Sequence, residues 1–538
     1  MRERINRDIR RLVNVLIVIF VALSAVAAYI QVSNRAFFNG PVLAQGPYAP
    51  LSCPPKAVPL RGTIYDRNGI WLARTVPDPN ATCGYRRVYN PVAVQAGLGP
   101  LLGYFSYKYG TAGIEATYND QLAGIEYSTT LQDFEARLLH KPRYGADVYL
   151  TIDLRLQEAA NNLYNQSALE GGVCQPPGSN PPGALIVEDP STGEILALVS
   201  RPAYDPNRID DPAYWRQITS DPDAPLLDHA TQGLYVPGST FKTVTLAAAL
   251  DTGLVSLGTT FSRNQAIYFT VNGQHLVWSD YFNDWRGVVS FPLSVEAAYA
   301  YSDNIAYARL AVQMGAQTWL NYVGRFGIAI PGRNVPPVPF DAPYTQSRAY
   351  NPTTDGQPTT FDANLLASSG FGQGQLLISP LTMTEITSAV AANGVLWDPH
   401  VVWKVVPHGV NPNDVAPVSP VMYGGGPVFS AQTAASIRRA MWAVATYGTG
   451  AAGLQRNGVY PYQTFVYMGG KTGTGQLHSG LPQAWWISLA PDDQAPGGGP
   501  ARLVITISKE HSGEGACQVW VANDLYQYAF DHHLAPSG

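Results

Sequence analysis

Three short motifs place reactive side chains at spacings that could support nucleophilic catalysis. The first is Ser239-Thr-Phe-Lys242, the second is Ser302-Asp-Asn304, and the third is a Lys-Thr-Gly-Thr-Gly run that begins at Lys471. A serine hydroxyl is a poor nucleophile unless a nearby base takes its proton, and a lysine amine can do so when it is neutral. The motifs therefore predict an activated serine that becomes acylated.

The elements around the first motif would bring the serine and the lysine together. Pro237 and Gly238 indicate a turn, and the apolar, alanine-rich segment that follows Ser239 is typical of a buried helix. Lys242 then lies about one turn further along the same face. Ser302 lies in a loop that leads into a helix, and Lys471 follows an aromatic and β-branched run that indicates a strand.

Each motif taken singly is weak evidence, because composition alone would produce roughly one or two chance matches in a chain of this length. Ser239 could be only a helix cap, Lys242 a solvated helix lysine, and Lys471 part of a turn at a strand end. The order of all three motifs along one chain is what favours the chemical interpretation.

This order resembles that of the class B penicillin-binding proteins, in a superfamily that also contains the class A β-lactamases. Further segments that resemble the family lie along almost the whole chain: Arg61–Gly69, Gly113–Asp120, Thr151–Ala160, Gly183–Asn207 and Gly370–Gly394. Independent matches in the right order support the family far better than one motif does.

The resemblance implies an α+β fold with two folded parts. Residues 148–538 would form the transpeptidase (penicillin-binding) domain, with a five-stranded antiparallel sheet flanked by helices. Residues 61–147 would form an elongated, mixed, non-catalytic pedestal that lifts this domain. With 538 residues, 46% of them hydrophobic, the chain can fill two cores. The strands of the sheet are expected near Val466 and at Ala184–Glu188, Glu194–Ser200, Ala484–Leu489 and Arg502–Ser508.

The resemblance also implies catalytic roles. Ser239 would be the nucleophile and Lys242 its base, and burial together with a second cation at Lys471 would lower the pKa of Lys242. Ser302 would relay the proton to the leaving amine, with Lys471 holding that proton in place. Asn304 carries an amide that can both donate and accept, as a substrate peptide bond requires.

The third motif is expected to bind substrate. The backbone N–H groups of Ser239 and Thr474 would stabilise the oxyanion. Thr472 and Thr474 offer hydroxyls to a substrate carboxylate, and Gly473 lacks a side chain, which would let the substrate backbone lie against this strand. Asp303 is interpreted as a structural loop residue.

The activity that the resemblance implies is peptidoglycan D,D-transpeptidation, in which Ser239 attacks a D-alanyl-D-alanine stem peptide and transfers it to an amine of a neighbouring strand. Such a protein would serve cell shape or cell division, and β-lactams would acylate the same serine. A D,D-carboxypeptidase remains open because only the acceptor differs. A β-lactamase needs a general base for water, yet the only glutamate between Ile305 and Gly470 is Glu385, in a segment that reads as a buried helix. A β-lactam sensor would not need the second and third motifs, which are intact.

The amino terminus predicts a membrane anchor. The apolar run Leu12–Ile30 is long enough to span a bilayer, and five arginines precede it. Residues 1–11 would be a cytoplasmic tail, 12–31 a single transmembrane helix and 32–60 a tether, with the catalytic domain outside the cytoplasmic membrane. A cleaved signal peptide is the alternative. The resemblance implies a SEDS-family glycan polymerase as a partner at the membrane.

The net charge, the histidines and the cysteines argue against a nucleic-acid-binding protein and against a metal site. The net charge of −5 gives no basic excess for nucleic acid. The nine histidines and four cysteines lack the spacing of a metal site, and no cofactor is expected. All four cysteines would lie outside the cytoplasm, where disulfides persist. Residues alone allow three pairings, or free thiols; the family fold implies Cys174 with Cys517, leaving Cys53 with Cys83.

Overall fold

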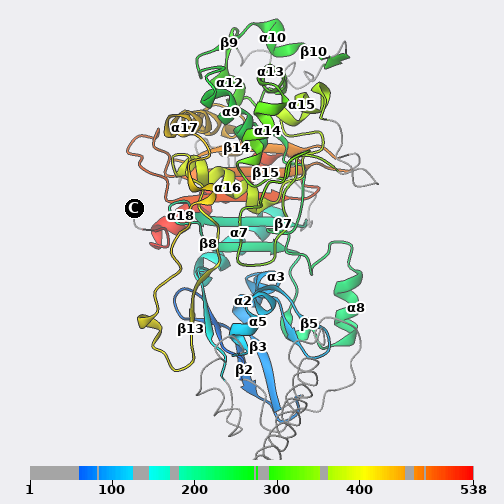
Figure 1. Ribbon diagram of the computed structural model, residues 1–538, viewed down its shortest axis with the longest axis vertical. Coiled ribbons are helices and arrows are strands. Elements are labelled where there is room, and N and C mark those ends of the chain that lie inside the picture. Colours follow the sequence, from blue (N-terminus) through cyan, green and yellow to red (C-terminus); the bar gives the residue numbers. More distant parts are fainter. Residues whose placement is uncertain are drawn as a thin grey trace, which may run out of the picture.

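The computed structural model describes residues 60–81, 84–124, 144–169, 181–271, 274–276, 290–351, 361–454, 466–477 and 480–536. These residues form an elongated molecule with two five-stranded sheets at different levels along its long axis (Figure 1). We refer to them as the upper sheet, which lies among the helices, and the lower sheet, which contains the amino-terminal strands.

The upper sheet is antiparallel throughout, with the strand order β14-β15-β16-β7-β8. The predicted five-stranded sheet is therefore confirmed. Its strands are β7 (Gly183–Asp189), β8 (Glu194–Arg201), β14 (Gly469–Gly475), β15 (Gln483–Ala490) and β16 (Leu503–Lys509). Strands β7, β15 and β16 are buried along their whole length because helices cover both faces of the sheet, which explains their nearly continuous apolar sequences.

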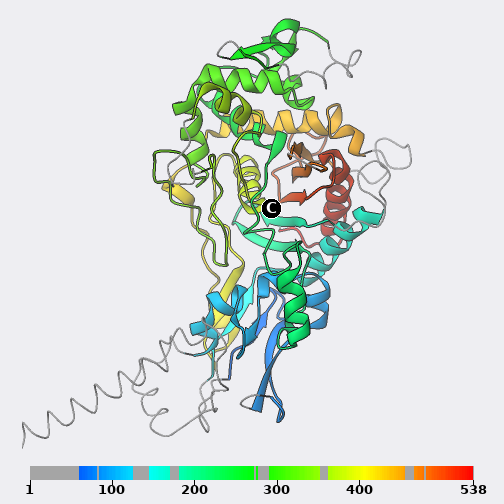
Figure 2. The same cartoon turned by 90° about the vertical axis from the view of Figure 1, so that its right-hand side faces the viewer.

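Two groups of helices cover this sheet (Figure 2). Helix α16 (Pro380–Ala391) packs on β7 and β16, while α7 (Leu154–Leu169) packs on β8 and against α18 (Val519–Asp531). Above α16, helices α9 (Lys242–Asp251), α12 (Val295–Ala300), α13 (Asn304–Met314) and α17 (Ala431–Thr446) surround the first two motifs. The first eight residues of α9 are all buried, as its alanine-rich sequence predicts.

The lower sheet has the order β13-β6-β1-β2-β3. Its strands are β1 (Ile64–Tyr65), β2 (Trp71–Pro77), β3 (Tyr85–Tyr89), β6 (Asp147–Leu150) and β13 (Val402–Val406). The predicted domain boundary at residues 147 and 148 thus falls inside β6, and β13 comes from far along the predicted transpeptidase domain. This strand covers the β6 edge, whose backbone groups would otherwise lack partners.

The lower and upper parts also share packing. One apolar cluster joins Ile64 and Val148 of the lower sheet to Ile186 and Leu198 of the upper sheet. A second connection is α8 (Pro212–Ser220), which lies beside β5 (Gly110–Thr111) in Figure 1. Its Trp215 ring stacks on Tyr109 at 4.2 Å between ring centroids. The segment that precedes the first motif is therefore packed against the amino-terminal part.

The remaining structural predictions fall largely on residues that the structure does not describe. The predicted tail, anchor and almost all of the tether, together residues 1–59, lie outside the described residues. Within the described ranges, no helix is both long and apolar enough to cross a bilayer. Cys517 is disulfide-bonded. Cys53, Cys83 and Cys174 also lie outside the described residues, so both predicted pairings remain predictions.

Candidate active site

Ser239 lies on a short 3₁₀-helix, η4 (Gly238–Phe241), which leads directly into α9. Gly238 has a φ of 56°, and a Cβ atom there would lie 2.5 Å from the backbone of Thr474. Only glycine can combine this conformation with this close approach. Ser239 itself is partly exposed, whereas Thr240 and Phe241 are buried. The turn therefore presents the Ser239 hydroxyl beside β14 on a rigid base.

Lys242 is fully buried one turn after Ser239. Its Nζ lies 3.0 Å from Ser239 Oγ, 3.1 Å from Ser302 Oγ, 2.6 Å from Ser302 O and 2.7 Å from Asn304 Oδ1. The amine thus contacts the first and second motifs together. Asn304 Oδ1 is occupied by this contact, which leaves its amide nitrogen as the group that can face a substrate.

The third motif contacts Ser302 of the second motif, which Lys242 also contacts. Lys471 is fully buried on β14, and its Nζ donates to Ser302 Oγ at 2.9 Å and to Thr472 O at 3.0 Å. Ser302 Oγ therefore bridges the two lysines. Ser302 has a φ of 62°, an uncommon conformation for a residue with a side chain. Asp303 holds this loop, because its carboxylate caps α13 by accepting from Ile305 N and Ala306 N. It is the structural residue that was expected.

Burial controls the protonation of both amines. Loss of hydration lowers the pKa of Lys242 to about 7, although the nearby Asp303 carboxylate opposes this shift. Burial, and after it repulsion by Lys242, places the pKa of Lys471 well below its ordinary value. The Asp303 carboxyl is also buried, which raises its pKa to about 7. The Lys242 amine and the Asp303 carboxyl therefore have pKa values near neutral pH, where an acid–base catalyst works best.

The backbone N–H of Thr474 faces the Ser239 turn. Strand β14 is an edge strand, and Thr474 O accepts from Gln373 Nε2 at 3.1 Å instead of from β15. The N–H and C=O of one residue point to the same side of an antiparallel strand, so Thr474 N–H also points outward. The Cβ position of Gly238 would lie 2.7 Å from this nitrogen. The Thr474 N–H thus lies beside the turn that carries Ser239, as the expected oxyanion site requires.

Two other third-motif residues, Thr472 and Gly473, make contacts within the protein that the sequence did not predict. Thr472 is buried, and its Oγ1 lies 2.6 Å from Thr449 Oγ1. A Cβ on Gly473 would lie 2.8 Å from Pro237 O and 2.8 Å from Thr240 Cγ2. Gly473 is therefore needed for packing the nucleophile turn onto β14, while its expected role in the approach of a substrate stays a prediction.

Several residues at the site were not found from the sequence. The rings of Tyr307 and Tyr299 lie under the amines of Lys242 and Lys471, at 5.7 and 5.6 Å from Nζ to the ring centroid. Gly372 O accepts from Gly238 N at 2.9 Å, next to Gln373. Thr449 donates its N–H to Ala300 O and shares its hydroxyl with Thr472. The tyrosine spacing around the second motif was a usable signal, whereas Thr449 and Gln373 carry none.

A family model for the penicillin-binding protein transpeptidase domain matches residues 183–501, more than half of the chain and all three motifs. The chain belongs to this penicillin-binding protein family. A second family model, for the penicillin-binding protein A dimerisation domain, matches residues 61–148. The first match includes every strand of the upper sheet except β16, and the second includes the first strands of the lower sheet.

Curated relatives of this penicillin-binding protein carry transpeptidase names. The peptidoglycan D,D-transpeptidase PbpA of Mycobacterium tuberculosis is 29% identical over 426 residues, which are 77% of this chain and 77% of that protein. The peptidoglycan D,D-transpeptidase MrdA of Escherichia coli is 28% identical over 339 residues, which are 60% of this chain and 49% of that protein.

Solved structures of the family share the fold. The imipenem acyl-enzyme complex of penicillin-binding protein A from M. tuberculosis has a TM-score of 0.71 at 25% identity, covering 88% of this chain and 99% of that one. The D,D-transpeptidase domain of a peptidoglycan glycosyltransferase from Eggerthella lenta has a TM-score of 0.66 at 26% identity. That match covers 89% of this chain and 100% of the other chain. The expected membership of the class B penicillin-binding proteins is confirmed.

Proposed function

We propose that this penicillin-binding protein is a serine-type peptidoglycan D,D-transpeptidase that is acylated by β-lactams. The observation that carries the proposal is one hydrogen-bonded chain: Ser239 Oγ to Lys242 Nζ at 3.0 Å, Lys242 Nζ to Ser302 Oγ at 3.1 Å, and Ser302 Oγ to Lys471 Nζ at 2.9 Å. The chain connects a partly exposed nucleophile to two fully buried amines. The transpeptidase names of the relatives support the same activity.

The contacts of Lys242 suit a neutral amine that acts as a base. Of the four oxygens that contact Lys242 Nζ, Ser302 O and Asn304 Oδ1 can only accept hydrogen bonds. The two N–H groups of a neutral amine can therefore donate to these two oxygens. The lone pair is then left for the hydroxyl proton of Ser239, at 3.0 Å between Nζ and Oγ. Because the pKa of Lys242 is about 7, much of the enzyme would hold this neutral form at neutral pH.

Acylation then follows in balanced steps. Ser239 Oγ attacks the carbonyl between the two D-alanines while its proton moves to Lys242 Nζ. The negative oxygen of the tetrahedral intermediate accepts from Ser239 N–H and Thr474 N–H. When the C–N bond breaks, the leaving D-alanine amine takes a proton from Ser302 Oγ, which is reprotonated by Lys242. An acceptor amine attacks the acyl-enzyme by the reverse route and restores Ser239.

The structure favours transfer to an amine over hydrolysis. Glu385, the one glutamate that the sequence offered as a base for water, lies on α16 and is 3% exposed, on a helix that packs against β7 and β16. Burial, followed by repulsion from Glu188 and Asp398, raises its pKa well above the ordinary value. A carboxyl buried in a helix that packs against the sheet is not placed to activate water at Ser239, so an acyl-enzyme formed with penicillin should persist.

A donor and acceptor assay tests the proposal. Purified full-length protein is given pentapeptide donor strands with and without strands that carry a free acceptor amine, and the products are separated by mass spectrometry. We expect cross-linked dimers and released D-alanine that both disappear in Ser239→Ala. Release of D-alanine without any dimer would instead identify a D,D-carboxypeptidase, and rapid turnover of penicillin would identify a β-lactamase.

We also propose that residues 12–31 anchor the protein in the cytoplasmic membrane, with the catalytic domain outside, where it works with a SEDS-family glycan polymerase. The support is the apolar run after five arginines and the family resemblance. Amino-terminal sequencing of the native protein tests the anchor, since a chain that begins near Ala28 would show that the segment is removed. Loss of polymerase co-purification on replacing the anchor tests the partner.

A further inference from the structure

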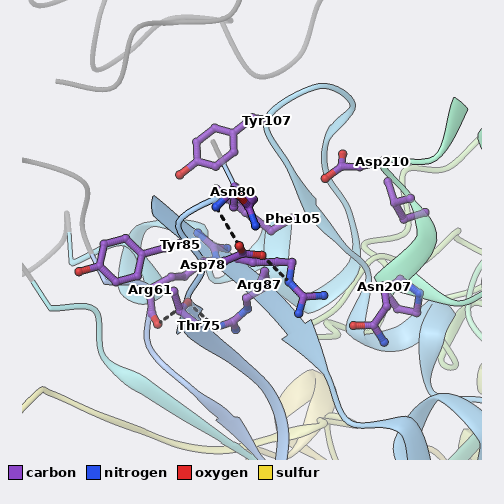
Figure 3. A pocket seen from close by; sticks show the side chains of 14 residues that line it. Arg61, Thr75, Asp78, Asn80, Tyr85, Arg87, Phe105, Tyr107, Asn207 and Asp210 are labelled. Carbon is purple, nitrogen blue, oxygen red and sulfur yellow. Dashed lines mark hydrogen bonds and ion pairs between the residues drawn. The ribbon is translucent and has the colours of Figure 1, made fainter. Parts of the chain in front are cut away.

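A cavity of about 340 Å³ lies in the amino-terminal part, at β2 and β3, well below α9, the helix that follows Ser239, in the view of Figure 1. Figure 3 shows it between two parts of the chain. One part is formed by Asp78, just after β2, and Tyr85, at the start of β3; the other is the segment before α8, which carries Asn207 and Asp210. Its size falls within the range of roughly 300–1,000 Å³ that is typical of small-molecule sites. The proposed transpeptidase mechanism uses none of its residues.

The cavity wall contains a buried cation that is not fully paired. Arg61 and Arg87 share one carboxylate, that of Glu115, and all three side chains are at most 6% exposed. Arg61 donates hydrogen bonds from all three of its guanidinium nitrogens, to Glu115 and Asn119. Arg87 donates from Nε to Glu115 Oε1 at 2.6 Å and from Nη1 to Gly62 O at 2.7 Å. Its Nη2, although buried, has no acceptor among the described residues.

The neighbouring acids do not supply that acceptor. Asp147 accepts from Thr63 N at 2.7 Å, and Asp78 pairs with Arg86 Nε at 3.2 Å. Two guanidiniums against one carboxylate leave about one unit of buried positive charge, which is costly unless an anion compensates it. Arg86 and Arg87 both line the cavity. Successive residues of a strand point to opposite faces, and Arg86 is exposed whereas Arg87 is buried, so a carboxylate placed there would contact the Arg86 guanidinium close to the buried positive charge of Arg87.

The rest of the cavity wall is acidic and aromatic. Asp210 is exposed, and among the described residues it accepts only from Ser106 Oγ, at 2.6 Å, so its second oxygen can take a ligand amine. Tyr107 is 41% exposed and Phe105 lies beside it, with 5.2 Å between ring centroids. The cavity thus combines a site for a carboxylate, a site for an ammonium group and an aromatic surface for the carbon chain between them.

We propose that this cavity binds a zwitterionic peptide, with a carboxylate on Arg86 beside the buried charge of Arg87, an amine on Asp210 and its aliphatic part on Tyr107. An uncross-linked stem peptide that carries carboxylates and one free amine has this chemistry. The identification of the ligand as a stem peptide rests on the proposed function, and it makes the cavity a second site for the same polymer. A purely acidic segment of a partner protein would leave Asp210 facing negative charge.

Calorimetry on the full-length protein tests the proposal after Ser239 has been acylated with penicillin, which blocks the catalytic site. The probe is the amino-terminally acetylated pentapeptide L-Ala-γ-D-Glu-L-Lys-D-Ala-D-Ala, with one amine and two carboxylates. We expect one remaining site, and binding that is roughly fivefold to tenfold weaker in Arg86→Gln or Asp210→Asn. Both changes are at exposed side chains, so the fold is retained. Arg74→Gln, an equal change of charge on β2 outside the cavity, should bind as the unmodified protein does.

Modified probes separate recognition from a structural effect. With a probe whose lysine amine is acetylated, Asp210→Asn should no longer weaken binding. With a probe whose two carboxylates are amidated, Arg86→Gln should no longer weaken binding. No binding to the acylated protein, or equal binding by both variants, would overturn the proposal. Equal affinity for an acidic peptide without an amine would overturn it in favour of a protein partner. Failure of penicillin to label Ser239 would count against the transpeptidase function only, because the two variants still decide the second site.

Discussion

The lowered pKa of Lys242 predicts how acylation depends on pH. A lysine with the ordinary pKa of 10.5 would be about 0.1% neutral at pH 7.5, whereas a pKa of about 7 makes it about 75% neutral, a gain of roughly 700-fold in the form that can accept a proton. Because the pKa is lowered, the active form is present above pH 7 and is lost as the pH falls. The rate constant for acylation should therefore rise about tenfold per pH unit from pH 5 to 6.5, and level off above about pH 7.5.

The assay is the second-order rate of labelling by a fluorescent penicillin, measured by stopped-flow between pH 5 and pH 9. Lys242→Arg keeps the positive charge but cannot give up its proton, so it should label about 10² to 10⁴ times more slowly and without this pH dependence. A native profile that is flat across this range, or that rises only above pH 9, would refute the role of Lys242 as a neutral base.

Three further substitutions test separate parts of the account. Ser302→Ala removes the oxygen between the two lysines and should slow penicillin labelling by about 10² to 10⁴, while Ser488→Ala, a buried serine of β15, should label normally. Lys509 is buried, which lowers its pKa to about 7. Its cost to folding is therefore full below pH 7 and fades towards the unfolded pKa of about 10.4; Lys509→Met should raise the free energy of unfolding by about 1–3 kcal/mol at pH 6, and by less at pH 10, in urea titrations. Glu115→Gln leaves Arg61 and Arg87 without their carboxylate, and the free energy of unfolding should fall by about 3–5 kcal/mol; a change below about 1 kcal/mol would contradict the proposed charge imbalance.

The parts of the site that follow from local geometry were predictable from the sequence. Ser239 and Lys242 meet because helical residues three apart share a face, and Asp303 begins α13 because aspartate is a good helix cap. Four strands of the upper sheet were also predictable, because strands buried on both faces have continuous apolar sequences. The strand expected near Val466 instead lies at Gly469–Gly475 and contains the third motif itself. Joining Ser302 and Lys471 to the first motif required the family resemblance, since the contacts bridge distant parts of the chain.

What could not be predicted depends on long-range packing. No local signal places β13 beside β6, because an edge strand gains its partner from the whole fold. Thr449 reaches Thr472 only because α17 ends beside β14. The depth of burial that lowers the pKa values of Lys242 and Lys471 is likewise a property of the packed domain. Among the described residues, Arg87 Nη2 lacks an acceptor because of how the surrounding residues pack, and no sequence motif predicts such an absence.

The central claim is that Ser239 is the nucleophile of a site assembled from all three motifs. The most direct test is peptide mapping of the full-length protein after brief incubation with labelled penicillin. The account predicts one adduct per chain, on the peptide that contains Ser239, stable for many minutes and absent from Ser239→Ala. An adduct on a different residue, or unchanged labelling of the Ser239→Ala variant, would contradict it.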